Sequence, residues 1–160
     1  METVRYITHK RNAGSWNMPI RKFGGAELIK AVIARLAADS LTGDYSVYDY
    51  IPDDASLPYI RISIPMGTKS SKFGSRDYEA EENMLVLDIW SDYLGDKEAA
   101  DMMNNVVQAL TGTTALSITS YPAPYQVLLE YSELVVDDSE PGVIVRHGIQ
   151  RYAIHMTPTS

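Results

Sequence analysis

The pattern of hydrophobic and polar positions changes its period once, within residues 83–110. The first half alternates, so that Leu85, Leu87 and Ile89 project to one face of a strand and the residues between them to the other. After a turn at 91–95, apolar residues recur at helical spacing. They form the stripe Ala99, Met102, Met103, Val106, Val107 and Leu110. The pattern predicts a central strand followed by a helix that folds back over it.

Residues that favour helix termini mark the ends of this helix and of an earlier one. Asp96 suits the N-cap of the later helix, and Gly112 suits its C-terminal stop. The earlier helix is predicted to open at Gly24-Gly25 and to close at Gly43. Its apolar stripe is Leu28, Ile29, Val32, Ile33 and Leu36.

Further segments have the composition and alternation of strands. The predicted strands are 45–51, 57–65, 125–136 and 143–157, with a short edge strand at 115–119. Pro65 is expected to end the second of them, and Gly148 to mark a bulge in the fourth. The order of elements predicts an α+β fold, a mostly antiparallel sheet with two helices packed on one face. The other face is expected to be rich in tyrosine (Tyr48, Tyr50 and Tyr59) and to suit burial against a partner.

Length and charge set the domain organisation. A chain of 160 residues is most simply one domain with a core of its own. The net charge is −7, which argues against binding nucleic acid over the whole surface. Residues 1–22 are nevertheless basic, so we predict a basic N-terminal arm at 1–22 and a single α+β domain at 23–160. The sequence has no cysteine, no signal peptide and no run long enough to span a membrane.

No constellation of residues predicts catalysis, a cofactor or a metal. His147 and His155 would lie roughly 26 Å apart on one strand, and His9 lies in the arm, so we interpret all three as surface residues. The acid pair Asp53 and Asp54 sits in a turn without the spacing of a calcium loop. Nucleophile, phosphate-loop and dinucleotide motifs are absent from the sequence. The chain is therefore predicted not to be an enzyme.

Two basic segments are the candidate contact regions. The arm carries an isolated Trp16, which a solvated tail would waste, and the loop predicted at 66–76 is longer than a hairpin requires. The arm is either a poorly ordered terminus or docks on another subunit. The loop is either solvated, or contacts a protein partner, or contacts passing DNA. The candidate contact residues are Arg11, Trp16, Lys69, Lys72, Phe73 and Arg76.

Four segments, in order, resemble a known family. Residues 47–60 (VYDYIPDDASLPYI) and 85–91 (LVLDIWS) are similar to the opening motif and the central strand of tail-completion proteins of long, non-contractile-tailed bacteriophages. The helix and the closing strand add Lys97, Ala99, Ala100, Leu110, Arg146, His147, Gly148 and Tyr152. The resemblance covers about residues 26–157, leaves the arm outside, and finds the loop at 66–76 expanded.

The resemblance implies a structural virion protein without catalysis. Its implied place is a hexameric ring at the phage neck, assembled in the bacterial host cytoplasm, which caps the tail tube protein and joins it to the head connector protein. DNA would pass through the lumen, and no membrane is involved. Tail terminator and head–tail joining protein remain open alternatives. Two rivals are a non-viral adaptor domain of the same architecture and an enzyme or nucleotide-binding domain.

Overall fold

A five-stranded sheet with two helices on one side forms the body of the protein. The computed structural model describes residues 24–70, 80–112, 116–118, 121, 126–139 and 143–156. The elements are α1 (Gly25–Ala38), β1 (Ser46–Tyr48), β2 (Tyr59–Ser70), β3 (Ala80–Ser91), α2 (Lys97–Thr111), β4 (Gln126–Asp137) and β5 (Val145–Met156).

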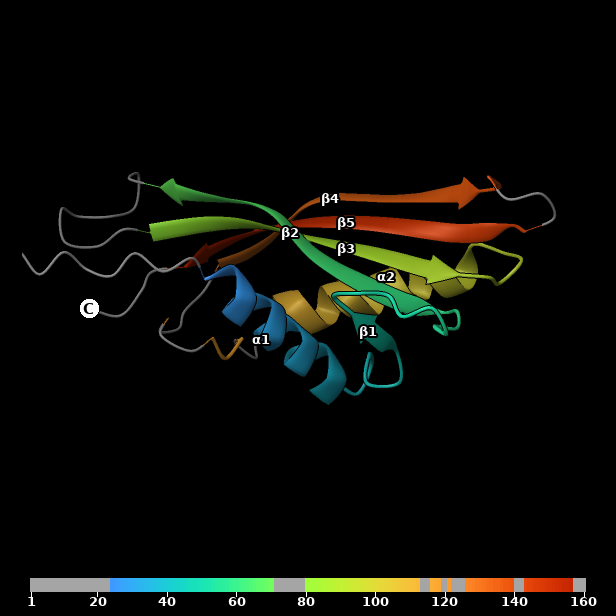
Figure 1. Ribbon diagram of the computed structural model, residues 1–160, viewed down its shortest axis with the longest axis horizontal. Coiled ribbons are helices and arrows are strands. Elements are labelled where there is room, and N and C mark those ends of the chain that lie inside the picture. The colour runs from blue at the N-terminus through green and yellow to red at the C-terminus, as the bar shows by residue number, and fades with distance from the viewer. Residues whose placement is uncertain are drawn as a thin grey trace, which may run out of the picture.

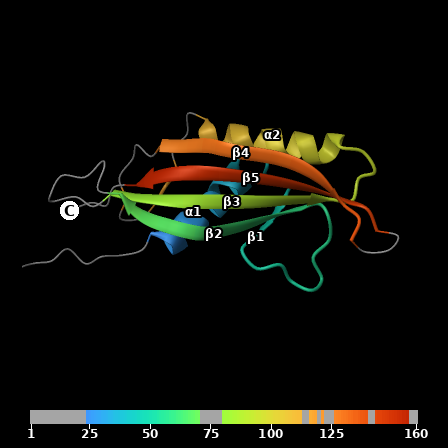
Figure 2. The same cartoon turned by 90° about the horizontal axis from the view of Figure 1, so that it is seen from above.

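The strands lie in the order β1-β2-β3-β5-β4. The β1–β2 pair is parallel, and the other three pairs are antiparallel. Both helices lie beneath the sheet in Figure 1, and the view from above in Figure 2 shows β2 to β5 side by side with α1 behind them. The predicted α+β fold, with a mostly antiparallel sheet and two helices on one face, is confirmed.

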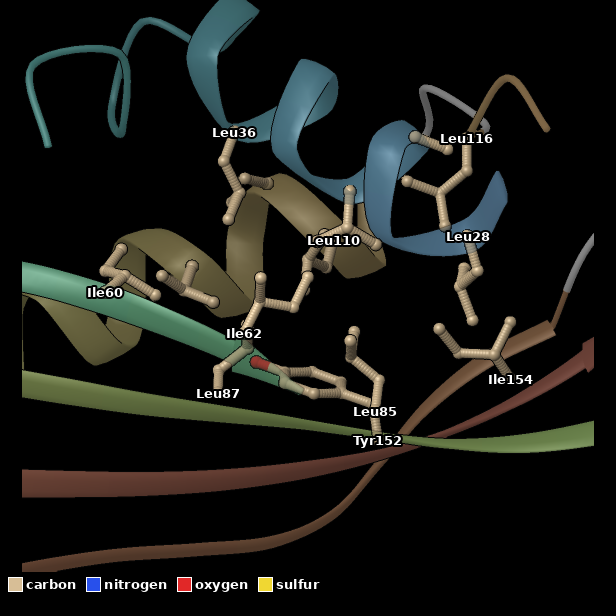
Figure 3. Close-up of a cluster of buried hydrophobic side chains, with 14 of the residues drawn as sticks. Leu28, Leu36, Ile60, Ile62, Leu85, Leu87, Leu110, Leu116, Tyr152 and Ile154 are labelled. Carbon is tan, nitrogen blue, oxygen red and sulfur yellow. The ribbon is translucent and has the colours of Figure 1, made fainter. Parts of the chain in front are cut away.

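The core fills the space between the helices and the sheet. Leu85, Leu87 and Ile89 of β3 are fully buried on the helix side, as their alternation predicts. Figure 3 shows side chains from α1, α2 and three strands meeting there, including Leu36, Leu110 and Tyr152. The hydroxyl of Tyr152 donates to Gln150 Oε1 at 2.9 Å, and Gln150 Nε2 donates to the carbonyl oxygen of Met103 at 3.1 Å. These bonds satisfy buried polar groups and attach α2 to β5.

Pro65 does not end its strand, contrary to the prediction. The register with β3 shifts between Ser63 and Met66, so two residues of β2 oppose one of β3, and the pairing then continues to Ser70. Proline is tolerated at such a bulge because the ladder is already interrupted there and its missing N–H is not needed. The loop predicted at 66–76 is therefore partly strand, and residues 71–76 of it lie outside the described part of the chain.

Gly148 marks close packing and not a bulge. The pairing of β5 with β3 and with β4 runs through Gly148 without a shift in register. A Cβ atom at this position would lie 2.7 Å from Met103 Sδ of α2, so glycine lets the helix approach the sheet. The shift in this part of the sheet lies between Leu129 and Tyr131 of β4.

Two further boundaries differ from the predictions. Helix α1 ends at Ala38, before Gly43, because the backbone of the C-cap residue Asp39 is extended and the Thr42 hydroxyl donates to the Leu36 carbonyl at 2.6 Å. Residues 116–118 do not form the expected edge strand. Leu116 and Ile118 are instead buried in the core, where their apolar side chains are shielded from solvent.

Candidate interaction surfaces

The sheet face opposite the helices is open and mixed in character. On β3 it presents Met84, Val86, Asp88 and Trp90, all of them half-buried. Tyr48 and Tyr59 meet edge-to-face on the same side, with ring centroids 5.9 Å apart, while Tyr50 lies in the loop beyond β1 and is highly exposed. Of the tyrosines expected to cover this face, Tyr48 and Tyr59 form a packed pair and Tyr50 projects into solvent.

Aromatic and charged side chains bridge the strands of this open face. The His147 ring stacks on Trp90 with centroids 3.8 Å apart, and its Nε2 lies 2.9 Å from Asp88 Oδ1. The Arg151 guanidinium lies over the Tyr131 ring, 4.9 Å from its centroid. His147, interpreted from the sequence as a surface residue, is therefore partly buried, stacked and hydrogen-bonded on this face. His155 lies farther along β5, with its Nδ1 3.8 Å from Glu82 Oε2.

The edge formed by β4 exposes large apolar side chains. Leu128, Leu129 and Tyr131 keep 42%, 39% and 40% of their surface exposed. The strand has β5 on one side and, in the described part of the chain, no strand on the other. Its charged side chains up to Asp137 are all acidic. Exposed apolar residues on an unpaired edge are a typical site for protein contact. We call Gln126–Asp137 the β4 edge.

A second exposed apolar surface lies at one end of the sheet. Figure 1 shows the β3–α2 loop and the ends of β4 and β5 at the same end of the molecule. Arg146 connects them, because its Nη2 donates to the Leu94 carbonyl at 2.9 Å and its Nε to Asp96 Oδ1 at 2.7 Å. Leu94 is 84% exposed. The exposed members of this end surface are Tyr93, Leu94, Val136, Val143 and Ile144.

Acidic residues surround the end surface. Asp92, Asp96 and Asp138 are exposed, and Arg146 pairs with one of them. Hydrogen bonds from Ser139 lower the pKa of Asp137, which favours its charged form. An apolar patch with an acidic rim fits a protein partner whose surface is apolar and basic, and it repels DNA.

At the opposite end, buried polar groups hold the start of α1. Glu81 Oε2 accepts hydrogen bonds from the Gly24 N–H at 3.1 Å and from the Tyr121 hydroxyl at 3.3 Å. Burial first, and then the Glu81 charge, raise the pKa of Tyr121 to about 12. Asn83 is fully buried nearby, and its side-chain amide has no hydrogen-bond partner in the structure described here. The chain from the predicted arm enters the fold at this end, at Gly24.

The residues predicted as contact sites fall mostly outside the described ranges. Lys69 lies in β2 and its backbone pairs with Glu81 of β3. Arg11, Trp16, Lys72, Phe73 and Arg76 lie in segments that the structure does not describe, so their predicted roles stay predictions. Sequence analysis missed the β4 edge and the end surface. The adjacent Leu128 and Leu129, and Leu94 within a turn, were the available signals.

Within the described residues, no group of three histidine or acidic side chains could hold a metal ion. Neither helix of this part of the chain is long and apolar enough to cross a membrane.

Comparison with known proteins identifies the family. The model of the family described as "Tail completion protein gp17" matches residues 27–129, which run from α1 into β4. The chain belongs to the tail completion protein gp17 family. It is therefore a structural protein of a bacteriophage tail. The match supports the family resemblance found in the sequence.

The fold of this tail completion protein is also found in solved structures. Matching solved chains number 25, and one of them comes from a structure titled "Virion of native gene transfer agent (GTA) particle". That chain is similar with a TM-score of 0.62 and 20% sequence identity, over 84% of this chain and 99% of its own length. No curated protein matches the sequence. At this identity the similarity concerns the fold.

Proposed function

We propose that the protein forms a closed hexameric ring at the phage neck, which caps the tail tube and joins the tail to the head connector. The observation that carries the proposal is the position of the exposed apolar residues, on the β4 edge and on the end surface around Leu94. A ring subunit needs a side surface for its neighbours and an end surface for the component stacked on it. The two surfaces have this arrangement.

The family and the solved neighbour support this position in the particle. The family is named for tail completion, and the neighbour belongs to the virion of a gene transfer agent. A tail is completed at an end of its tube, where a ring matches the symmetry of a tubular partner. The acidic rim of the end surface favours a tube or connector protein with basic residues on the facing surface.

The basic segments are proposed as assembly contacts of a single domain. In this proposal residues 23–160 form the domain and residues 1–22 form an arm. Lys69, together with Lys72, Phe73 and Arg76, contacts a neighbouring protein or the DNA that passes through the lumen. Arg11 and Trp16 contact a neighbouring subunit, where charge-assisted hydrogen bonds and an aromatic anchor would offset the conformational entropy lost on binding.

We also propose that the protein catalyses no reaction and binds no cofactor. The His147–Asp88 pair is the arrangement in the described residues that most resembles catalytic machinery. Its imidazole is covered on one side by Trp90, and the pair is half-buried on the sheet face. Stacking and a single hydrogen bond to a carboxylate serve to pack the face.

The test is assembly of phage particles without this protein. The proposal predicts filled heads and tails that stay separate. Infectious particles should form again when the protein is supplied. Tubes longer than normal would identify a terminator, because an uncapped polymer continues to grow, and tubes of normal length would identify a head–tail joining protein. Normally joined, infectious particles in the absence of the protein would contradict the proposal.

A further inference from the structure

Beyond its bulge, the β4 edge lacks two of the features that commonly protect an edge strand. Between Gln126 and Asp137 there is no lysine and no proline, the residues with which proteins commonly prevent pairing at an edge. The bulge between Leu129 and Tyr131 interrupts the edge. Beyond it, the run from Tyr131 to Asp137 pairs with β5 in continuous register. Every second residue of this seven-residue run points its backbone N–H and C=O groups away from β5, where a further strand could bind them.

The charge of the β4 edge points to a basic partner strand. Glu130 and Glu133 are exposed, and Asp138 follows the strand. The arm at 1–22 has five basic residues and a single glutamate. Within it, Val4-Arg5-Tyr6-Ile7-Thr8 consists of four residues that favour strands and one arginine. Opposite charges placed across a strand pair stabilise it, so the arm is complementary to the edge in both backbone and charge.

The position of Gly24, where the arm joins the fold, bears on whether the arm pairs with the β4 edge of its own subunit or of a neighbouring one. Gly24 lies beside Met156, and β4 begins at Gln126, opposite His155, so the β4 edge of the same subunit starts close to the end of the arm. A short connection would be enough to reach it. Residues 9–23 instead provide about 50 Å of extended chain, more than the roughly 40 Å length of β4 itself. A connection of this length suits a neighbouring subunit.

We propose that residues 4–8 of one subunit add a strand to the β4 edge of the next, between Tyr131 and Asp137. The inference rests on the proposed ring, because a ring places each arm beside a neighbour's edge at high effective concentration. It names the contact that links the subunits: a sixth strand, with Arg5 near Glu133. The contact is partly electrostatic, so it weakens as salt concentration rises.

Engineered cysteines test the contact directly, because the chain has none of its own. A Tyr6→Cys variant is mixed with variants that carry one cysteine at Ser132, Glu133, Leu134 or Val135, and the mixture is oxidised. Mixing separate variants makes every arm–edge disulfide intermolecular. Strand pairing predicts yields that alternate along β4, since successive side chains point to opposite faces. Mass spectrometry of the linked peptides identifies each product.

A Gln108→Cys variant, with its cysteine on the exposed side of α2, is the matched control and should link to the Tyr6→Cys variant only at background level. The inference is overturned if arm–edge products do not exceed this background. It is also overturned if the yield of arm–edge disulfides does not alternate along β4, or if these disulfides form only in a variant that carries both cysteines in one chain. Sedimentation of the parent protein separates this outcome from failure of the proposed function, because a ring can be present while the arm–edge disulfides are absent.

Discussion

The imidazole of His147 lies parallel to the indole of Trp90, with an interplanar angle of 8° and 3.8 Å between the ring centroids. The two residues are direct neighbours on β5 and β3, on the sheet face without helices. The Oδ1 atom of Asp88 lies 2.9 Å from Nε2 of His147, within hydrogen-bonding distance. The open face is therefore stabilised by contacts between its own strands before any partner binds.

The stacked pair predicts a measurable coupling energy. Aromatic pairs of this kind contribute about 0.5–1.5 kcal/mol beyond the area they bury. A double-mutant cycle with Trp90→Leu and His147→Gln, measured by urea denaturation, should give a coupling in this range. Trp90→Leu combined with His155→Gln is the control and should be additive within about 0.5 kcal/mol, because the two sites are far apart. Equal couplings in both cycles would contradict the role of stacking.

Close packing at Gly148 predicts a costly substitution by alanine. The added Cβ would lie 2.7 Å from Met103 Sδ and 3.4 Å from Ile89 Cβ, so α2 or its methionine must shift. Overpacking of this kind costs about 1–3 kcal/mol in free energy of unfolding. Gly95→Ala is the control, because there a Cβ meets only the exposed Tyr93 ring. If Gly148→Ala costs no more than the control, Met103 moves aside freely and the packing explanation is wrong.

The raised pKa of Tyr121 predicts a loss of stability in alkali. Below about pH 10 the tyrosine is protonated in both the folded and the unfolded chain, so its contribution is constant. Between about pH 10 and the folded pKa of about 12, the unfolded chain loses the proton first, and the free energy of unfolding falls. Burial also raises the pKa of Tyr152, so part of the decline does not depend on Tyr121.

The variant that tests this assignment is Tyr121→Phe, which cannot ionise at this position. Its free energy of unfolding should decline less steeply than that of the parent between about pH 10 and 12, when both are followed by urea denaturation. Below pH 10 the two curves should run parallel. Identical slopes above pH 10 would mean that Tyr121 ionises as freely in the folded protein as in the unfolded chain.

The end surface predicts a variant that folds normally and binds poorly. Leu94 is 84% exposed, so Leu94→Ser should change the free energy of unfolding by less than about 0.5 kcal/mol. Binding of the purified protein to tail tubes or to the connector, measured by co-sedimentation, should weaken. Leu41→Ser is the matched control, because Leu41 is also exposed but lies in the turn after α1. Equal binding of both variants would remove the end surface from the assembly contacts.

Periodicity predicted the main elements because buried side chains recur every second residue in a strand and about every 3.6 residues in a helix. Leu85, Leu87 and Ile89 alternate because one face of β3 is covered, and the stripe of α2 follows from its contact with the sheet. Pro65 and Gly148 were misinterpreted because the role of each is set by a residue or strand that is distant in the sequence. A bulge opposite β3 accommodates the proline, and Met103 of α2 explains the glycine.

The interaction surfaces were harder to predict than the fold. Whether Leu128 and Leu129 are exposed depends on β4 being an edge strand, and the strand order places β5, the last strand in sequence, between β3 and β4. Alternation within one strand carries no information about its position in a sheet. Leu94 has a similar explanation, because its position beside the end of β4 and the start of β5 follows from the Arg146 contacts to the loop and not from the local sequence.

Electron microscopy of the purified protein, alone and mixed with tail tubes, tests the proposed ring most directly. We expect closed particles with six-fold symmetry and a central opening, either free in solution or seated on the ends of the tubes. A protein that remains a monomer in solution and leaves the tube ends bare would contradict the proposed function.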